Sequence, residues 1–183
     1  MRLYRVLPFR PEATDGEPGH PLFVPTTQGA GRADGPGAYA VLYVSDAPAG
    51  AAAEAFGAIP LWTETMFEKP ALQNGRRALA TYELRDEAPV LDLDDANALK
   101  RLGLRPSDVV TRDRTVTQRW ALAVYLERRW VGVRWWSYYD PGWHSYALWD
   151  RRQLSPIGVE RLSIAHPVII EAAAVLQRVL PPA

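Results

Sequence analysis

An arginine, a tyrosine and a glutamate at even spacing are the residues of this sequence whose types best suit chemistry. Tyr43 follows Arg32 by eleven residues, and Glu54 follows Tyr43 by eleven more. A guanidinium binds phosphate oxygens through charge-assisted hydrogen bonds, an aromatic ring stacks on a base, and a carboxylate stabilises positive charge that develops on a sugar. We therefore predict that these three side chains form a catalytic centre in a pocket for a nucleotide.

Cleavage of the bond between nicotinamide and ribose in NAD is a reaction that such a set supports. The leaving group is already cationic, and the transition state resembles an oxocarbenium ion, as in glycoside hydrolysis. The reaction therefore requires a carboxylate near the sugar but no general acid. An aromatic wall for a base is available, because six of the seven tryptophans lie between Trp120 and Trp149.

Other kinds of site find little support in the sequence. There is no cysteine, and the three histidines, at positions 20, 144 and 166, lack the spacing of metal ligands, so we expect no metal. The glycines of Gly31–Gly37 (GRADGPG) fit neither a phosphate-binding P-loop nor a dinucleotide-binding fold. Ser137 and His144 leave a Ser-His-Asp triad open as a much weaker alternative.

A short strand and a helix must hold the tyrosine and the glutamate in place. Ala40–Val44 (AVLYV) is an apolar run typical of a buried strand. The helix after it is predicted to have Ser45 or Asp46 as its cap, a proline in its first turn, and Gly57 to end it in the left-handed conformation. Small residues surround the glutamate along this helix, which leaves room for a ligand.

The rest of the pattern predicts an α+β fold with mixed sheets and flanking helices. Further strands are expected at Leu3–Leu7, Ala78–Leu84, Val90–Leu93, Val131–Trp136 and Ser145–Trp149, with a short one near Leu162–Ile164. Further helices are expected at Ala96–Leu102, Thr115–Arg129 and Pro167–Leu180. Long connections at 8–37 and 58–76 join the first elements, and we interpret the second as a packed connection rather than a lid.

Length and charge narrow the class of protein. The 183 residues predict one domain, 1–183, and 48% hydrophobic residues are enough for a sizeable core. Lys plus Arg and Asp plus Glu both number 21, so we expect neither attachment to a membrane nor direct binding of nucleic acid. No stretch resembles a signal peptide or a membrane span, and we therefore expect a cytoplasmic protein.

Two further features have alternative interpretations. Asp92, Asp94 and Asp95 invite a metal site, but capping of the following helix explains them better. Arginines are interleaved with tryptophans between Arg119 and Trp149, a pattern that suggests a nucleic-acid or protein-binding module. The zero net charge of the chain argues against that module.

The order of these residues resembles that of the RES-domain family, which is named for its Arg, Glu and Ser. The motifs that carry the resemblance, in chain order, are Leu3–Val6 (LYRV), Arg32, Tyr43, Glu54, Gly132–Ser137 (GVRWWS) and Ala147–Trp149 (ALW). They are short, but together they span nearly the whole chain. The sequence departs from the family at Ala33 and Asp34, where an aromatic and a small polar residue are more usual.

The resemblance implies a fold similar to that of ADP-ribosyltransferase toxins and an enzyme that consumes NAD. The reaction would be hydrolysis or phosphorolysis of NAD or, as the alternative, mono-ADP-ribosylation of a protein. Family members commonly serve as bacterial toxins, and an Xre-type helix-turn-helix antitoxin covers their active site. Nothing in this sequence reads as a helix-turn-helix, so we expect the antitoxin on a separate chain. We also consider a homodimer.

The resemblance also implies roles for individual residues. Arg32 would hold the phosphates or a ribose of NAD, and Tyr43 would stack on or orient the nicotinamide. Glu54 would stabilise the oxocarbenium ion, and Ser137 would form a hydrogen bond nearby. Arg5, on the first strand, would be an additional contact to phosphate.

Overall fold

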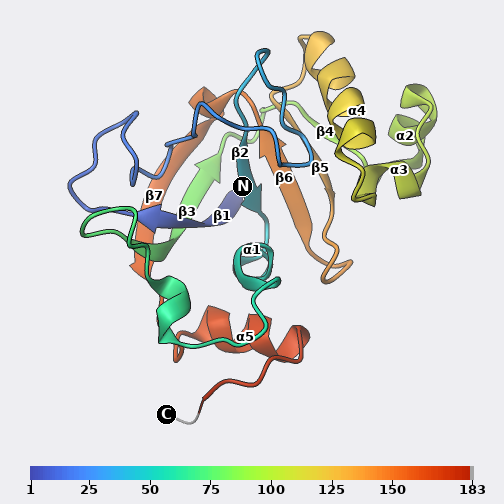
Figure 1. The fold of residues 1–183 in the computed structure, drawn as a ribbon. Coiled ribbons are helices and arrows are strands. Elements are labelled where there is room, and N and C mark those ends of the chain that lie inside the picture. The colour runs from blue at the N-terminus through green and yellow to red at the C-terminus, as the bar shows by residue number, and fades with distance from the viewer. Residues whose placement is uncertain (182–183) are drawn as a thin grey trace.

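Seven strands form one mixed sheet at the centre of the computed structural model, which describes residues 1–181 (Figure 1). The order across the sheet is β4-β5-β6-β2-β1-β3-β7. The strands are β1 (Arg2–Phe9), β2 (Leu42–Ser45), β3 (Arg76–Leu84), β4 (Val90–Asp92), β5 (Gly132–Trp136), β6 (His144–Leu148) and β7 (Leu154–Arg161). Only the β4–β5 pair is parallel among the pairs of this described sheet, and the helical segment between these two strands supplies the crossover that a parallel pair needs.

Helices lie in two groups around the sheet. Figure 1 shows α1 and α5 stacked on one side of it, whereas α2, α3 and α4 gather beside β4 and β5. The helices are α1 (Pro48–Phe56), α2 (Ala96–Leu102), α3 (Pro106–Val110), α4 (Arg114–Leu126) and α5 (Pro167–Val175), with 3-10 turns η1 (Glu64–Phe67) and η2 (Arg151–Gln153). The predicted α+β class with a mixed sheet and flanking helices is confirmed.

Separate hydrophobic clusters attach the two helix groups to the sheet. Phe56, Trp62 and Phe67 are fully buried and pack edge to face between α1, α5 and β3. On the other side, Trp120 of α4 packs against Trp135 of β5. Burial of such large aromatic side chains is a major source of stability in a domain of this size. The connection 58–76 is thus a packed one, as predicted.

The long connection between β1 and β2 is held by side chains that donate hydrogen bonds to its backbone. Tyr82 Oη, Arg5 Nη1 and Arg151 Nη1 lie 2.7, 3.1 and 2.6 Å from the carbonyl oxygens of Pro21, Phe23 and Leu22. Val24 next to them is buried. Three donors from three separate elements therefore fix the middle of a segment that has no strand or helix of its own.

The end of the chain differs from the sequence prediction. The last strand is β7 at Leu154–Arg161 rather than a short strand near Leu162–Ile164. One side of β7 pairs with β3 and most of its residues are exposed, so the apolar alternation that marks a half-buried strand is missing. Helix α5 ends at Val175, five residues before the predicted end.

Two local predictions for α1 were also wrong, and one short helix was missed. In the described chain neither Ser45 nor Asp46 caps α1: its N-cap is Ala47, and Asp46 accepts hydrogen bonds from His144 instead. Gly57 has a right-handed φ of −58°, so the helix does not end in the left-handed conformation. The short helix α3 was not predicted, because its five residues are too few for periodicity to show. By contrast, Asp95 caps α2 as expected.

Within residues 1–181, no helix is both long enough and apolar enough to cross a bilayer. The same residues hold no group of three or more histidine, cysteine, aspartate or glutamate side chains placed to bind a metal ion.

We predict that Gly132→Ala destabilises the fold. A Cβ at this position would overlap the carbonyl oxygen of Ala147 and the side chain of Leu148 on β6. Relief of that overlap requires a shift of two paired strands, and we expect a loss of about 1–3 kcal/mol in the free energy of unfolding measured with urea. Gly158→Ala is the matched control, because a Cβ at Gly158 on β7 meets nothing within 4 Å. Equal stability of the two variants would contradict the prediction.

Candidate active site

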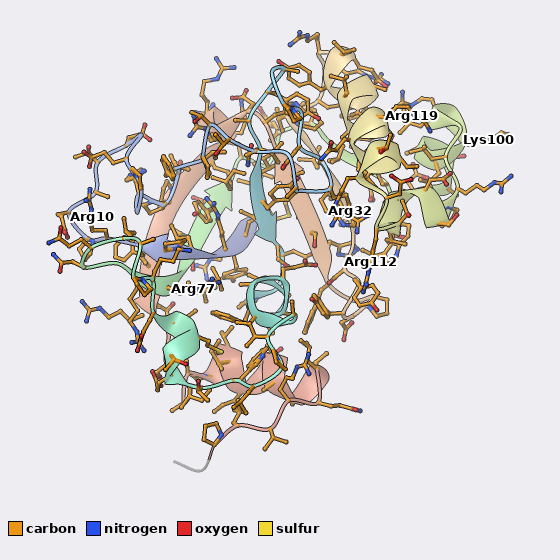
Figure 2. The ribbon with its side chains drawn as sticks, in the orientation of Figure 1. Arg10, Arg32, Arg77, Lys100, Arg112 and Arg119 are labelled. Atoms are coloured by element: carbon orange, nitrogen blue, oxygen red, sulfur yellow. The ribbon has the colours of Figure 1, made fainter. Side chains whose placement is uncertain are left out.

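A pocket of about 500 Å³ contains four of the five predicted site residues. It opens between helix α1, strands β1 and β2, the ends of β5 and β6, and the segment that joins α3 to α4. Arg5, Arg32, Tyr43 and Glu54 line it, together with residues that include Ser145, Arg112, Arg114, Trp135, Trp136 and Tyr139. Figure 2 shows Arg32 and Arg112 between α1 and the group of α2, α3 and α4, and Arg10 and Arg77 toward the left of the view.

Another cavity, of about 660 Å³, is larger but holds none of the predicted residues. It lies near the end of α4 and is lined by side chains such as Tyr125, Trp130, Trp149 and Arg151. Acidic and basic side chains are mixed in its wall: Arg152 is paired with Asp150. We place the candidate active site in the smaller pocket, because the chemistry-bearing side chains converge there.

Glu54 is held at the wall of this pocket by two serine hydroxyls. Ser137 Oγ and Ser145 Oγ each lie 3.3 Å from Glu54 Oε1. Ser137 directly follows β5, and Ser145 lies on β6 opposite Trp135 of β5. Both hydroxyls donate to the same carboxyl oxygen, so the pairing of these two strands sets where the carboxyl group of α1 can lie.

Burial raises the pKa of Glu54 above its usual value. The residue as a whole is exposed, but the protein around its carboxyl group removes water from the charged form. Hydrogen bonds from Ser145 and Ser137, followed by the charges of Arg32 and Arg114, act in the opposite direction and lower the pKa. The two hydroxyls and two guanidiniums thus stabilise the charged form of Glu54, which burial destabilises.

The hydroxyl of Tyr43 is fully engaged within the protein. It donates to Asp34 Oδ1 at 2.7 Å and accepts from the backbone N–H of Ala33 at 2.9 Å. Burial, with the hydrogen bond to Asp34, raises the pKa of Tyr43 well above its usual value. The hydroxyl therefore stays protonated, and the ring rather than the hydroxyl is what Tyr43 presents to a ligand.

Ala33 and Asp34, where the sequence departs from the family pattern, have structural roles. Ala33 is buried in the core cluster that includes Val133 and Trp135. Asp34 is 3% exposed, and its second carboxyl oxygen accepts from the N–H of Gly31 at 2.7 Å. The acidic side chain thus closes the turn that carries Arg32 and accepts the hydroxyl proton of Tyr43 in a hydrogen bond.

Arg32 and Arg5 direct guanidinium nitrogens toward backbone carbonyls. Arg32 donates to the carbonyls of Val109, Val110 and Thr111 at the end of α3, the last at 2.8 Å, and its guanidinium lies 5.9 Å from the ring centre of Trp135. Arg5 donates to Pro21 and Phe23. Both arginines line the pocket, but these contacts show that each also holds a connecting segment in place.

Several pocket residues were not singled out from the sequence. Ser145 was predicted only as the start of a strand, although the expected hairpin with Val131–Trp136 would have brought it near Ser137. Arg112 and Arg114 flank the start of α4 and carried no motif. Tyr139, in the turn after Ser137, donates its backbone N–H to Ser137 Oγ at 3.2 Å and so helps to orient that hydroxyl.

The fold and the pocket define an α+β protein with one carboxylate set among guanidinium and aromatic side chains. Residues 2–168 match the family model described as RES domain, and the chain belongs to the RES-domain family. The chain is also similar to one in a solved structure entitled "Crystal structure of the M.tuberculosis MbcT-MbcA toxin-antitoxin complex". The two share 22% sequence identity with a TM-score of 0.65, over 94% of this chain and 88% of that one, a likeness of fold. No curated protein is similar enough to this chain to count as a match.

We predict that removal of both serine hydroxyls raises the pKa of Glu54 further. In Ser137→Ala with Ser145→Ala, the carboxylate loses the two donors that lower its pKa, while the burial that raises it remains. A pH titration of the Glu54 carboxyl carbon by ¹³C NMR should show a higher midpoint than in the wild type. Ser155→Ala, on exposed β7, is the control and should leave the midpoint unchanged. An unchanged midpoint in the double variant would show that the hydroxyls do not act on the carboxylate.

Proposed function

We propose that the protein is the toxin of a bacterial toxin–antitoxin pair and cleaves NAD at the nicotinamide–ribose bond. The observation that carries the proposal is the position of Glu54, whose carboxyl group two serines hold in a pocket lined by arginines and aromatic rings. Membership of the RES-domain family supports it, as does a structural neighbour whose title names a toxin–antitoxin complex.

The proposed chemistry needs a carboxylate and little else. The bond between ribose C1′ and the nicotinamide nitrogen breaks, and its electron pair neutralises the pyridinium ring. Positive charge develops at C1′ and the ring oxygen, where the Glu54 carboxylate stabilises it. Water then adds at C1′ and loses a proton, which gives ADP-ribose. With inorganic phosphate as the acceptor, a phosphate oxygen bonds to the same carbon, which is numbered C1″ in the product, ADP-ribose 1″-phosphate. Both routes release neutral nicotinamide and deplete the NAD of the cell.

The other side chains of the pocket suit the remaining parts of NAD. Trp135, Trp136 and Tyr139 offer aromatic surface on which a nicotinamide or adenine ring can stack. The arginines supply positive charge for the diphosphate. Among the described residues that line the pocket Glu54 is the one acidic side chain, so the carboxylate does not compete with a second one for the sugar.

Glu54→Gln should abolish most of the NAD cleavage. The amide keeps the shape of the side chain but removes the negative charge that stabilises the transition state. We expect a fall in nicotinamide release of roughly 100-fold or more, the scale of losing one strong electrostatic contact in an active site. Release is measured by chromatography with purified protein, and Glu160→Gln on exposed β7 serves as control. Equal turnover by Glu54→Gln would refute the role of this residue.

The raised pKa of Glu54 also predicts how activity and stability change with pH. Cleavage should be lost as the pH falls through the raised pKa, hence at a higher pH than for an ordinary glutamate with a pKa of about 4.3. Because the folded protein binds this proton more tightly than the unfolded chain, the contribution to stability is fully present below the unfolded pKa and is lost as pH rises through the folded one. Glu54→Gln should therefore unfold at pH 7 at the same or a higher temperature than the wild type; a lower melting temperature by circular dichroism would contradict this.

Cleavage of NAD and the alternative, mono-ADP-ribosylation of a protein, differ in the molecule that accepts the ADP-ribose. Purified protein incubated with ³²P-labelled NAD in bacterial lysate should leave the label in ADP-ribose or its phosphate. Label that remains on a protein band, and is absent with Glu54→Gln, would favour the transferase instead. A parallel reaction with and without inorganic phosphate shows which small acceptor is used.

We further propose that an Xre-type antitoxin on a separate chain covers the pocket. Support comes from the family and from exposed aromatic surface at the pocket: Tyr138, which lines it, is 70% exposed. The product of the adjacent reading frame, mixed with the purified protein, should elute with it in size-exclusion chromatography and stop NAD cleavage. Cleavage that continues in the isolated complex would argue against coverage of the pocket.

A further inference from the structure

The charge of the pocket is concentrated in four arginines that serve different purposes. Arg5, Arg32, Arg112 and Arg114 line it beside the single acidic residue Glu54, although the whole chain has no net charge. Within residues 1–181 none of these four guanidiniums forms an ion pair at salt-bridge distance. A cluster of cations without counter-charges favours an anionic ligand.

Two of these arginines already use their donors within the protein. Arg5 donates to carbonyls of the long connection after β1. Arg32 donates through both terminal nitrogens to three consecutive carbonyls, those of Val109, Val110 and Thr111. A guanidinium has five N–H donors in a fixed plane, so one that faces three carbonyls has few left to face a phosphate.

Arg114 is in the opposite situation. Its Nε donates to the carbonyl of Ala30 at 3.0 Å, which fixes the plane of the guanidinium, but its Nη1 is buried and has no hydrogen-bond partner among the described residues. A buried donor without an acceptor is unfavourable, and more so on a charged group. Arg114 and Arg32 line the same pocket, and burial, followed by the like charge of Arg114, lowers the pKa of Arg32. An anion in the pocket would supply the missing acceptor and separate the two like charges.

Arg112 extends the same positive surface to the mouth of the pocket. It is exposed, and its guanidinium lies 5.7 Å from the ring centre of Tyr138, which faces it from the turn after β5. Arg32 donates to the carbonyl of Thr111, the residue directly before Arg112. It therefore holds the start of the short segment that carries Arg112 and Arg114. In Figure 2, Arg112 lies next to Arg32 in the same region of the pocket.

We propose that Arg114, assisted by Arg112, binds the diphosphate of NAD, and that Arg32 is a positioning residue that holds the segment carrying both. The assignment rests on the proposed function for the identity of the ligand. It moves the main phosphate contact from Arg32, where the sequence resemblance places it, to a segment more than 75 residues further along the chain.

Binding of ADP-ribose, which needs no turnover, tests the assignment directly. Titration calorimetry compares the wild type with Arg114→Gln, Arg114→Lys and Arg112→Gln. Arg119→Gln is the control, because Arg119 is an exposed residue of α4, the helix that begins at Arg114, and lies outside the pocket (Figure 2). We expect roughly 10- to 100-fold weaker binding for Arg114→Gln, a smaller loss for Arg112→Gln, and partial recovery in Arg114→Lys, which keeps the charge but not the planar donors. The control should bind like the wild type. Thermal unfolding of each variant reports whether the fold is intact.

A phosphate-free ligand separates recognition of the diphosphate from a general effect on the pocket. Binding of adenosine, followed by NMR, should be unchanged within about 2-fold in Arg114→Gln, because adenosine lacks the group that Arg114 contacts. In NAD cleavage the same variant should raise KM by the factor seen for ADP-ribose and change kcat much less. An equal loss for adenosine and ADP-ribose would show a structural role and overturn the assignment.

The remaining outcomes distinguish this inference from the proposed function. ADP-ribose binding by Arg114→Gln equal to that of the wild type overturns the inference and leaves NAD cleavage intact. Binding that depends on Arg114, without release of nicotinamide from NAD, upholds the diphosphate contact and refutes the proposed reaction. A wild type that neither binds ADP-ribose nor cleaves NAD overturns both. If Arg114→Gln does not fold, Arg114→Lys and Arg112→Gln carry the same comparison, and unchanged binding in both refutes it.

Discussion

The contact between Glu54 and the hydroxyls of Ser137 and Ser145 connects the part of the structure that contains α1 and α5 with the part that α4 covers. Helix α1 carries the carboxylate and packs with α5, whereas Ser145 lies on β6 and Ser137 directly follows β5, in the strand pair that α4 covers. A carboxylate that loses water on burial must gain hydrogen bonds, and Ser145 and Ser137 supply them. The position of the Glu54 carboxyl group is therefore set by a strand pair that lies far from it in the sequence.

Guanidinium groups hold the irregular parts of this fold. Arg5, Arg32 and Arg151 each donate to carbonyls of segments that lie outside the sheet, and an arginine can serve several carbonyls at once because its donors form a rigid plane. This explains how a chain with long connections keeps a defined pocket. It also means that the number of arginines at a site is a poor guide to how many of them face the ligand.

The sequence predicted regular elements better than their ends. Ala78–Leu84 and Val131–Trp136 were recognised as strands because most of their side chains are buried, which leaves apolar residues in a strand-like pattern. Strand β7 was misplaced because it is exposed and contains Pro156 and Gly158, so its backbone pairing with β3 leaves no trace in residue type. The cap of α1 was wrong for a related reason: Asp46 is bound by His144, about 100 residues away.

The sequence alone identified the family and selected the candidate residues Arg32, Tyr43, Glu54 and Ser137, because their types and order along the chain resemble the motifs of that family. The tertiary structure decided what each of them contacts. It engaged the Tyr43 hydroxyl with Asp34, directed Arg32 toward the end of α3, and brought Ser145, Arg112 and Arg114 into the pocket. Hydrogen-bond partners depend on which segments pack together, and residues up to 91 positions apart meet at Glu54. Spacing along the chain carries no record of such contacts.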